Sequence, residues 1–430
     1  MNSIPSPPNC DGPPTSGGEA PRNVLLVTLA PPYPPTDGRR IHLWSLVRAL
    51  CAEGWATTLV SLAEPAEREP ADELRYLCEQ VELVRWNPST YLSRRYARRL
   101  AALFRSRPFN AVQTFVPELQ SAIRRQFDRR EFAAVICDEM YAAANLPEGS
   151  PAPAIVDTQM VAHELLARYA RRMPGIGRRL YARAESVKMR RWESEIGRGV
   201  YALGATCPRE AAIFRRLCPG TRVVPLPNVV DAGEYEPTYA AEREDVVLFS
   251  ASFDWFPNQD AAEFFAQRVL PELRRLRPRA VFRLAGRCRS AEFRRRMRQF
   301  DGVELAGFVP DMRREIARAT LCAVPLRIGS GTRLKILEAA AMGKAVVSTA
   351  LGAEGLDFVP GEEIAIADDP ERFGLALAVL LAQRERRREI GRRARRRVER
   401  DYSLPVLRSA LNAVLDPLAR PRTQAARGGA

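Results

Sequence analysis

The stretch RIGSGTRLKILEAAAMGKAVVST, residues 327–349, joins a glycine turn, a helix and an apolar strand. Gly329 and Gly331 permit backbone conformations closed to other residues and a close approach of a ligand. Glu338 stands inside the helix between Ile336-Leu337 and three alanines, a run that otherwise predicts burial. A carboxylate in such a place needs a partner, and the glycine turn beside it indicates where a ligand can bind.

The start of this helix predicts an anion site. We expect the helix to begin near Thr332, where free backbone amides and the helix dipole attract negative charge. Arg333 and Lys335 oppose that dipole and cost stability unless an anion is bound, and a diphosphate removes the conflict. Glu338 lies one turn further on, about 60° from Lys335 around the helix. It can accept hydrogen bonds from ribose hydroxyls, or it can pair with Lys335 or a nearby arginine at the helix surface.

Outward from this stretch the chain alternates strands and helices twice. The strand-like runs are short, rich in Val, Ile and Leu, and typical of parallel sheets buried on both faces. They cover residues 24–30, 57–63, 81–86, 133–137, 154–156, 246–250, 281–285, 303–308, 321–325, 345–349 and 364–367. Helical periodicity covers residues 38–53, 90–105, 118–129, 161–197, 259–276 and 371–383. We therefore predict an α/β fold of two Rossmann-like doubly wound domains facing a cleft, with ligands beyond the carboxyl ends of the strands.

The length of 430 residues suits two domains of about 200 residues each. A turn-rich stretch around residues 225–237 interrupts the alternation and indicates an interdomain linker. The predicted segments are a disordered leader at 1–22, a first domain at 23–230, a linker at 231–243, a second domain at 244–418 and a disordered tail at 419–430.

Composition excludes several classes of protein. The net charge of +15 favours phosphate-bearing partners, although the excess is mostly arginine on helices, where it can also be plain solvated surface. No apolar run approaches the ~18 residues of a membrane span. The eight cysteines contain no C-x-x-C pair, and the two histidines are too few for a histidine-based metal site. No G-x-G-x-x-G, P-loop or Asp-x-Asp motif occurs, so we predict neither a cofactor nor a metal.

The opening stretch resembles the glutamate motif of the family 4 glycosyltransferases, which have the GT-B fold. In that family two glutamates eight positions apart flank the turn, and the second contacts the nucleotide ribose. The resemblance implies that role for Glu338. The first position falls on Ser330 here, whereas the family's first glutamate usually contacts the transferred sugar. The form Gly-Thr-Arg-x-Lys-x-x-Glu is similar to a recurring variant within the family.

The resemblance extends from residue 23 to about 410. PPYPPTDGRRIHLWSLVRAL, residues 31–50, resembles the first loop of exopolysaccharide-type members. It implies that Gly38, with Arg40 beside it, abuts the donor phosphate or the acceptor. LAGFVPDM, residues 305–312, is similar to a loop around the base, with Val309 as a candidate contact.

Two segments depart from the family. SASFDWFPNQDA, residues 250–261, resembles the first loop of the second domain, where many relatives carry an Arg and a Lys for the diphosphate. Because this chain has Ser252, Asp254 and Asn258 there, Arg333 and Lys335 are the predicted phosphate cations. Relatives often have a histidine soon after the position of Asp157. The next histidine here is His163, so no catalytic histidine is assigned, and we expect His42 to have a packing or surface role.

The resemblance implies a retaining, metal-independent glycosyltransferase of the hexosyltransferase class, acting in polysaccharide biosynthesis. It would move a sugar from a nucleotide-diphosphate donor, bound mainly by the second domain, to a glycan or lipid-linked acceptor. The predicted catalytic residues are Arg333 and Lys335. The predicted donor-binding residues are Gly38, Arg40, Val309, Gly329, Ser330, Gly331, Thr332 and Glu338. Alternatives are a basic nucleic-acid-binding protein, which lacks a recognised binding module, and a nucleotide-sugar epimerase on the same fold.

The predicted localisation is cytoplasmic, with peripheral contact at the inner face of the membrane. Residues 93–105 place four apolar side chains on one stripe of a basic helix, which suits anionic lipid headgroups. The alternative is that this helix packs on the sheet while its arginines face water. Further arginines can add to the same surface: Arg168, Arg171, Arg172, Arg178 and Arg179.

Overall fold

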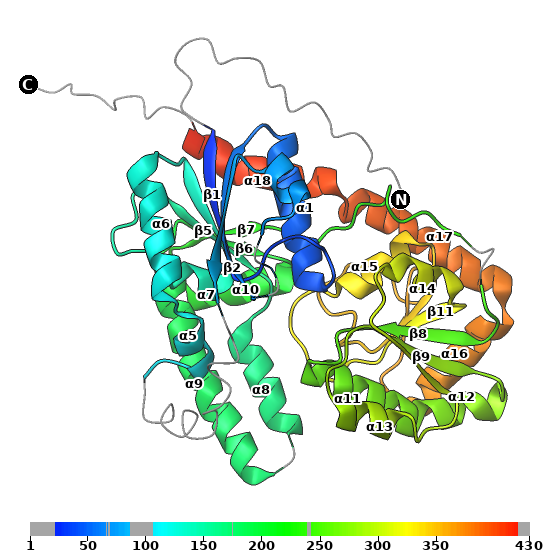
Figure 1. The fold of residues 1–430 in the computed structure, drawn as a ribbon. Helices are drawn as coiled ribbons and strands as arrows, with labels where there is room; N and C mark the ends of the chain where they lie inside the picture. Colours follow the sequence, from blue (N-terminus) through cyan, green and yellow to red (C-terminus); the bar gives the residue numbers. More distant parts are fainter. Residues whose placement is uncertain are drawn as a thin grey trace, which may run out of the picture.

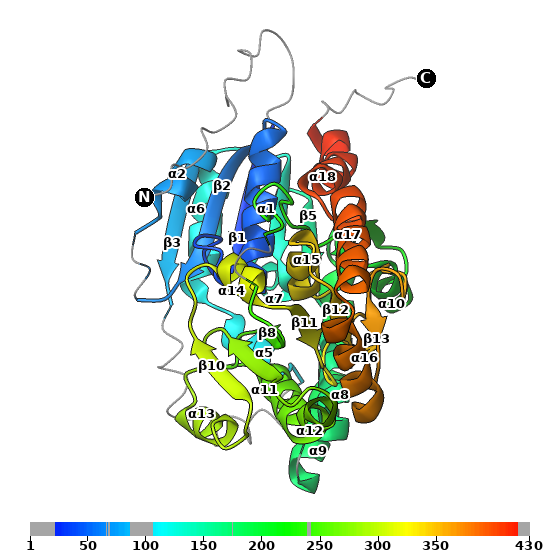
Figure 2. The ribbon, with the colours of Figure 1, turned by 90° about the vertical axis from the view of Figure 1, so that its right-hand side faces the viewer.

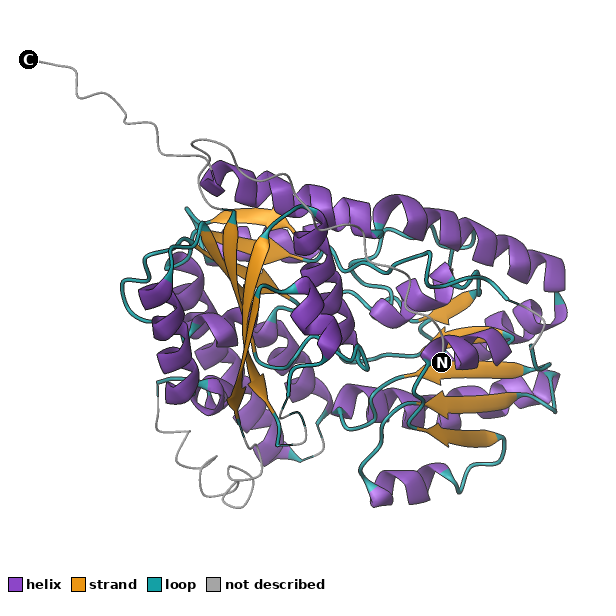
Figure 3. Ribbon diagram, turned by 45° about the horizontal axis from the view of Figure 1, so that its top comes forward, coloured by secondary structure: helices purple, strands orange, loops and turns teal. Residues whose placement is uncertain are grey.

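The computed structural model describes residues 22–65, 67, 69–86, 106–173, 175–238 and 242–419. These residues form two α/β domains, each with a parallel sheet between helices (Figures 1 and 3). The predicted α/β class with two doubly wound sheets is confirmed. Almost all of the predicted leader and tail, and the predicted basic helix at residues 93–105, lie outside the described residues.

The first sheet has seven parallel strands in the order β3-β2-β1-β4-β5-β6-β7. Its strands are β1 (Asn23–Thr28), β2 (Ala56–Ala63), β3 (Gln80–Arg85), β4 (Ala134–Asp138), β5 (Ala154–Thr158), β6 (Ala202–Ala205) and β7 (Arg222–Pro225). Its helices are α1 (Gly38–Ala52), α2 (Asp72–Leu77), α5 (Phe109–Thr114), α6 (Pro117–Arg129), α7 (Glu139–Ala143), α8 (Ala162–Arg172), α9 (Ile176–Arg198) and α10 (Pro208–Leu217).

Strand β1 shows why its residues form a central strand. Val24 and Leu26 belong to the apolar core on one face of the sheet, and Leu25 and Val27 belong to the core on the other. All four are fully buried, as the two-residue period of a strand requires when helices cover both faces.

Two features of the first domain differ from the prediction. Strands β6 and β7 are too short to give a clear apolar run, and β7 is half exposed, so the sequence pattern did not reveal them. The single long helix predicted at 161–197 is wrong, because the chain breaks there into α8 and α9. Gly175 has φ +88° at the break, a backbone conformation that favours glycine and that no helix contains.

The second sheet has six parallel strands in the order β10-β9-β8-β11-β12-β13. Its strands are β8 (Val246–Ser250), β9 (Val281–Ala285), β10 (Val303–Gly307), β11 (Leu321–Val324), β12 (Val346–Ser348) and β13 (Ala365–Ile366). The helices of this half of the chain are α11 (Phe256–Phe264), the π-helix η1 (Phe265–Val269), α12 (Leu270–Leu276), α13 (Ala291–Met297), α14 (Met312–Arg318), α15 (Leu334–Ala341), α16 (Pro370–Ala382), α17 (Arg384–Asp401) and α18 (Leu404–Ala419).

The last helix returns to the first domain, and Figure 2 shows α17 and α18 running along both domains. Leu407, Leu411 and Val414 of α18 are buried in the core that also contains Val24 and Leu26 of β1. Residues 404–418, which the sequence analysis assigns to the second domain, therefore pack on the first. Their apolar period of three to four residues supplies a face that suits either sheet, so the pattern alone does not select the partner.

The carboxyl ends of the two sheets meet at the domain junction. Gln159, just after β5, contacts Gly331, which lies between β11 and α15. Ile41 of α1 packs against the apolar core of the second domain. In the part of the chain that the structure describes, no helix is both long and apolar enough to cross a membrane.

Candidate active site at the domain junction

Gly331 lies where the turn after β11 touches the first domain. Its φ of +83° favours glycine, and a Cβ atom there would lie 2.3 Å from the carbonyl oxygen of Gln159. Any other residue would push the two domains apart. Gly331 was predicted to let the backbone approach a ligand closely, and in this structure the group next to it is the backbone of Gln159 in the other domain.

Arg333 folds back under the turn instead of standing free at its surface. Its side chain is 8% exposed, and Nη1 donates to the carbonyl oxygens of Ser330 (2.6 Å) and Gly331. Nη2 also contacts the turn, since a Cβ at Gly329 would lie 2.3 Å from it. Burial lowers the pKa of Arg333 to about 10, and the charges of Glu210 and Glu354 oppose this. The guanidinium holds the turn, and its charge stays next to the start of α15.

Lys335 lies in the first turn of α15 and is also largely withdrawn from solvent. Its Nζ donates to Asn258 Oδ1 (3.2 Å) and lies 4.5 Å from the ring centroid of Phe249. Burial lowers the pKa of Lys335 to about 7, and the positive charge of Arg333 adds to this effect. No ion pair joins Lys335 to an acidic residue among those described. A lysine with a pKa this low gains stability from an anion that can stay beside it.

Glu338 receives its hydrogen bond from a residue of the interdomain linker. The hydroxyl of Tyr235 donates to Oε1 of Glu338 (3.0 Å), and Glu338 is 7% exposed. Burial raises the pKa of Glu338 to about 7, although the Tyr235 bond and then the charge of Lys335 act against the rise. The surface ion pair with Lys335, one of the two sequence interpretations, is not formed within the described residues.

The start of α1 meets the start of α15 (Figure 1). A Cβ at Gly38, the first residue of α1, would lie 3.5 Å from Cδ1 of Leu334, the first residue of α15. The N-termini of the two helices therefore lie close together at the domain junction. Arg40, beside Gly38, is paired with Glu67 and, at 3.7 Å, with Asp37.

A second carboxylate faces the turn from the first domain. Ser330 is 5% exposed and accepts a hydrogen bond from the amide of Val161 (3.1 Å) while donating to Oε1 of Glu210 (3.4 Å). Glu210 is fully buried in α10, and Thr206 donates to its other oxygen (2.6 Å). Burial raises the pKa of Glu210 despite the opposing bond from Thr206 and charge of Arg333. The turn thus has a carboxylate next to Ser330, supplied from the other domain.

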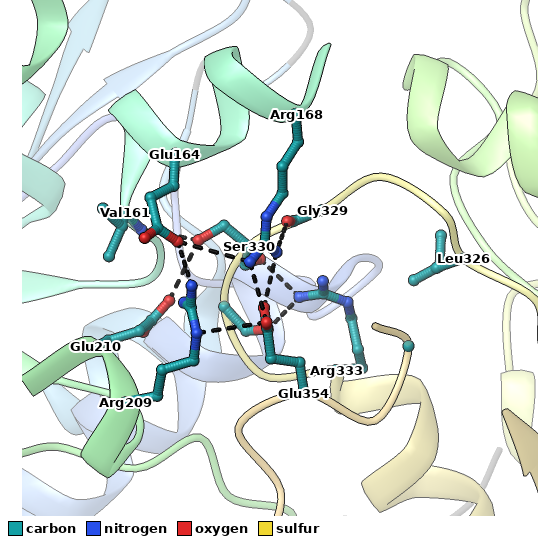
Figure 4. A network of polar contacts seen from close by, with 12 residues as sticks. Val161, Glu164, Arg168, Arg209, Glu210, Leu326, Gly329, Ser330, Arg333 and Glu354 are labelled. Atoms are coloured by element: carbon teal, nitrogen blue, oxygen red, sulfur yellow. Dashed lines mark hydrogen bonds and ion pairs between the residues drawn. The ribbon is translucent and has the colours of Figure 1, made fainter. Parts of the chain in front are cut away.

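Arginines and carboxylates alternate across the junction beside this turn (Figure 4). Arg168 of α8 donates to the carbonyl of Gly329 (2.5 Å) and to both oxygens of Glu354 (2.7 and 3.0 Å). Arg209 of α10 pairs with Glu164 (2.5 Å) and with Glu354 (3.3 Å). Two cations of the first domain thus converge on one carboxylate of the second and hold the domains together.

Thr332 and Val309, two further predicted donor contacts, lie in different loops of the second domain. The hydroxyl of Thr332 accepts a hydrogen bond from Nδ2 of Asn228 (2.6 Å), which precedes the linker. Val309 follows β10 and packs, partly buried, against the apolar core of the second domain. In the loop after β8, Asn258 donates to the carbonyl of Ser252 (2.8 Å), and Asp254 accepts from the amide of Arg289 (2.6 Å).

His42 has a more specific environment than the packing or surface role expected for it. Its Nε2 lies 2.5 Å from Oδ2 of Asp157, and both side chains are fully buried. Burial lowers the pKa of His42, but the charge of Asp157 and its hydrogen bond outweigh burial and raise the pKa overall. His163 is held by Glu193 through Nδ1 (2.6 Å).

Sequence reasoning missed Tyr235, Glu210 and the His42–Asp157 pair. A signal existed for His42, because it lies four residues after Gly38 and therefore shares its face of α1. Tyr235 and Glu210 had none, since each meets its partner more than 100 residues away. Among the described residues, no group of three or more His, Cys, Asp and Glu side chains is arranged to hold a metal ion.

Comparison with known proteins relates part of this chain to one family. Residues 244–383 match the family described as glycosyl transferases group 1. No curated protein sequence matches the chain. The match covers most of the second domain and about a third of the chain, and together with the fold it identifies the chain as a glycosyltransferase with the GT-B architecture.

Solved structures of low sequence identity share the whole fold. Sucrose-phosphate synthase from Thermosynechococcus elongatus superposes with a TM-score of 0.71 at 17% identity, covering 92% of this chain and 98% of that one. HepE of Anabaena, in complex with UDP-glucose, gives 0.63 at 12% identity over 92% and 99%. WaaG, a glycosyltransferase involved in lipopolysaccharide biosynthesis, gives 0.59 at 13% identity over 91% and 99%. At these identities the likeness establishes the fold alone.

Proposed function

We propose that the chain transfers a sugar from a nucleotide-diphosphate donor to a glycan or lipid-linked acceptor, with retention of anomeric configuration and without a metal. The observation that carries this proposal is the meeting of two helix N-termini at Gly38 and Leu334. Two positive dipole ends and the nearby cation of Lys335 repel one another unless an anion lies between them. A diphosphate supplies that anion. The complex of HepE with UDP-glucose, on the same fold, agrees with such a donor.

Glu338 is the proposed ribose contact. It lies one turn inside α15, and Tyr235 shows that its carboxylate accepts a hydroxyl hydrogen bond at this place. A ribose hydroxyl is the same kind of donor. Hydrogen bonds from a sugar to a charged group contribute about 1.5–3 kcal/mol each.

The proposed chemistry relies on positioned charge. As the bond between the anomeric carbon and the diphosphate breaks, the acceptor oxygen bonds to that carbon, and its proton passes to the departing diphosphate. The amides at the start of α15, Lys335 and the charge of Arg333 stabilise the negative charge that develops on the diphosphate. Ser330 and Glu210 lie beside the turn, and the proposal gives them contact with the transferred sugar. The expected product has the donor's anomeric configuration, which the proton coupling of the anomeric position reports.

A thermal-shift panel of UDP, GDP and ADP tests the donor. A nucleotide at ~100 times its dissociation constant adds about 2.7 kcal/mol to stability. We expect one base to raise the melting temperature clearly more than the others. If none of the three does, the proposed function is wrong.

Activity in EDTA tests the absence of a metal requirement. With a donor that binds and any acceptor that is turned over, we expect the rate to be unchanged by the chelator, because side chains and helix amides supply the positive charge. Full inhibition by EDTA that manganese reverses would replace this mechanism with a metal-assisted one.

A further inference from the structure

A pocket of about 680 Å³ opens between α8 of the first domain and the second domain. Its walls are Arg168, Arg171, Arg172, Asp260, Arg327 and Leu351. Figure 1 shows α8 facing α11 across this part of the junction. Both domains contribute arginines, so a ligand held here contacts both.

Two of the arginines are fixed in place. Arg327 is bound by both oxygens of Asp260 (2.7 and 3.1 Å) and lies over the ring of Phe264, 4.4 Å from its centroid. Arg168 is held by Glu354 and by the carbonyl of Gly329. Each guanidinium is oriented before a ligand arrives, which lowers the entropic cost of binding.

The other two arginines have no partner in the described part of the chain. Arg171 and Arg172 end α8, are exposed, and make no hydrogen bond or ion pair with the described residues. The lining residues carry four positive charges and one negative charge, which gives +3, and Glu354 beside Arg168 reduces this to +2. Arginines in the last turn of a helix are favoured by the helix dipole. That effect explains their position on α8 but not the convergence of Arg327 from the other domain.

The pocket adjoins the proposed active site without being part of its donor region. Arg168 lines the pocket and also bonds the carbonyl of Gly329 in the turn before α15. The cations proposed for the donor diphosphate, Lys335 and Arg333, are not among the lining residues. A group bound in the pocket thus lies beside the turn but contacts a different set of cations.

We propose that this pocket binds a phosphate group carried by the acceptor, with Arg171 and Arg172 as its principal contacts. The proposal rests on the proposed function and names the acceptor class: a saccharide that bears a phosphate, either free or as part of a larger glycan or lipid-linked chain. Guanidinium groups bind phosphate through paired N–H donors, and arginines from two directions can each engage a different oxygen.

The test measures the binding of inorganic phosphate to the full chain by thermal shift. Sodium chloride at equal ionic strength is the reference. Saturating UDP, or whichever nucleotide binds, occupies the donor site. We expect phosphate still to raise the melting temperature of the wild type. The double substitution Arg171→Gln/Arg172→Gln should weaken phosphate binding at least tenfold. The matched control Arg190→Gln/Arg191→Gln, an adjacent exposed pair on α9, should leave it unchanged.

Glucose 6-phosphate against glucose, and vesicles with phosphatidic acid against pure phosphatidylcholine, identify the source of the phosphate. Preferential binding of the sugar phosphate that needs Arg171 and Arg172 supports the proposal. The proposal is overturned if phosphate changes the melting temperature no more than chloride does, or if saturating nucleotide abolishes the phosphate shift. It is also overturned if the protein binds only the phosphatidic acid vesicles. If no nucleotide binds but phosphate binding still needs the two arginines, the donor assignment fails and the phosphate site remains.

Discussion

The starts of α1 and α15 meet at the domain junction, yet they are built differently. At α1 the side chain of Asp37 caps the helix by accepting from the amide of Arg40 (3.2 Å), and Arg40 is neutralised by Glu67. At α15 no side chain caps the helix, and Lys335 and Arg333 form no ion pair with the described residues. An N-terminal capping side chain typically contributes ~1 kcal/mol.

The difference separates a structural helix start from a functional one. The α1 terminus presents less uncompensated positive charge, because Asp37 accepts from one of its amides and Arg40 is paired with Glu67. The α15 terminus retains unsatisfied amides and buried positive charge, a state that an anion stabilises. We therefore expect substitutions near the start of α15 to change stability and nucleotide affinity more than substitutions near the start of α1.

Glu338→Ala should have the largest effect on the α15 side. We expect about 100-fold weaker binding of the nucleotide diphosphate, because roughly 3 kcal/mol of hydrogen bonding to a charged group is lost. Calorimetric titration measures the affinity, and Glu118→Ala, at an exposed glutamate of α6, is the control. Unchanged affinity would remove the ribose assignment, and loss of folding would instead give Glu338 a structural role.

The pH dependence of stability should carry the signature of the same carboxylate. Its pKa in the folded chain is about 7, against 4.5 for an ordinary glutamate. A raised pKa means that the folded state holds the proton more tightly, so its stabilising contribution is complete below pH 4.5 and is lost as the pH rises to about 7. Urea unfolding across this window should show wild type losing about 2 kcal/mol relative to Glu338→Gln. If the free energies of unfolding of wild type and Glu338→Gln change with pH in parallel, the pKa of Glu338 is not raised.

Lys335→Met tests whether the two helix starts differ as described. It removes a buried cation whose pKa is lowered, so we expect the ligand-free protein to become more stable while nucleotide affinity falls about tenfold, ~1.4 kcal/mol. Arg40→Met, at the compensated terminus, should not stabilise the protein and should change affinity less. Equal effects of the two substitutions on both quantities would erase the distinction between the helices.

Tyr235→Phe should give the smallest change. The Tyr235 hydroxyl lowers the pKa of Glu338, so its removal leaves fewer ionised carboxylates at pH 7. We expect nucleotide affinity several-fold weaker at pH 7, about 1 kcal/mol, and close to wild type at pH 9. A loss of the same size at both pH values would show that the hydroxyl acts in another way, for instance by contacting the nucleotide itself.

Local sequence pattern was sufficient for elements whose signal is local. Strands β8 and β9 begin and end where their apolar runs predict, because each is five residues long and bounded by turn residues. The break between α8 and α9 was missed because helical periodicity continues on both sides of it. The placement of α18 on the first domain depends on which apolar surface remains uncovered, which only the assembled chain decides.

The candidate site also has parts that a local pattern predicts and parts that depend on distant segments of the chain. The turn, the start of α15 and the buried Glu338 follow from a contiguous motif, and the structure brings them together. Their partners come from other parts of the chain: Tyr235 from the linker, Gln159 and Glu210 from the first domain. One sequence carries no signal for such contacts, because they depend on how the two domains close on each other. Whether these residues bind the donor stays a prediction.

The chain crosses between the domains twice, once before α18 and once in the linker, and the two crossings are bonded to each other where the amide of Val230 donates to the carbonyl of Tyr402 (3.0 Å). Two covalent connections at one place act as a pivot. Figures 1 and 2 place α8 and α11 at the opposite end of the molecule from the junction of α17 and α18. A rotation of the domains about this pivot would displace most the elements farthest from it, so the pocket lined by Arg171 and Arg172 would open wider than the helix starts near Gly38. A cut in the linker alone would also leave the two domains joined, because α18 remains anchored in the first sheet's core.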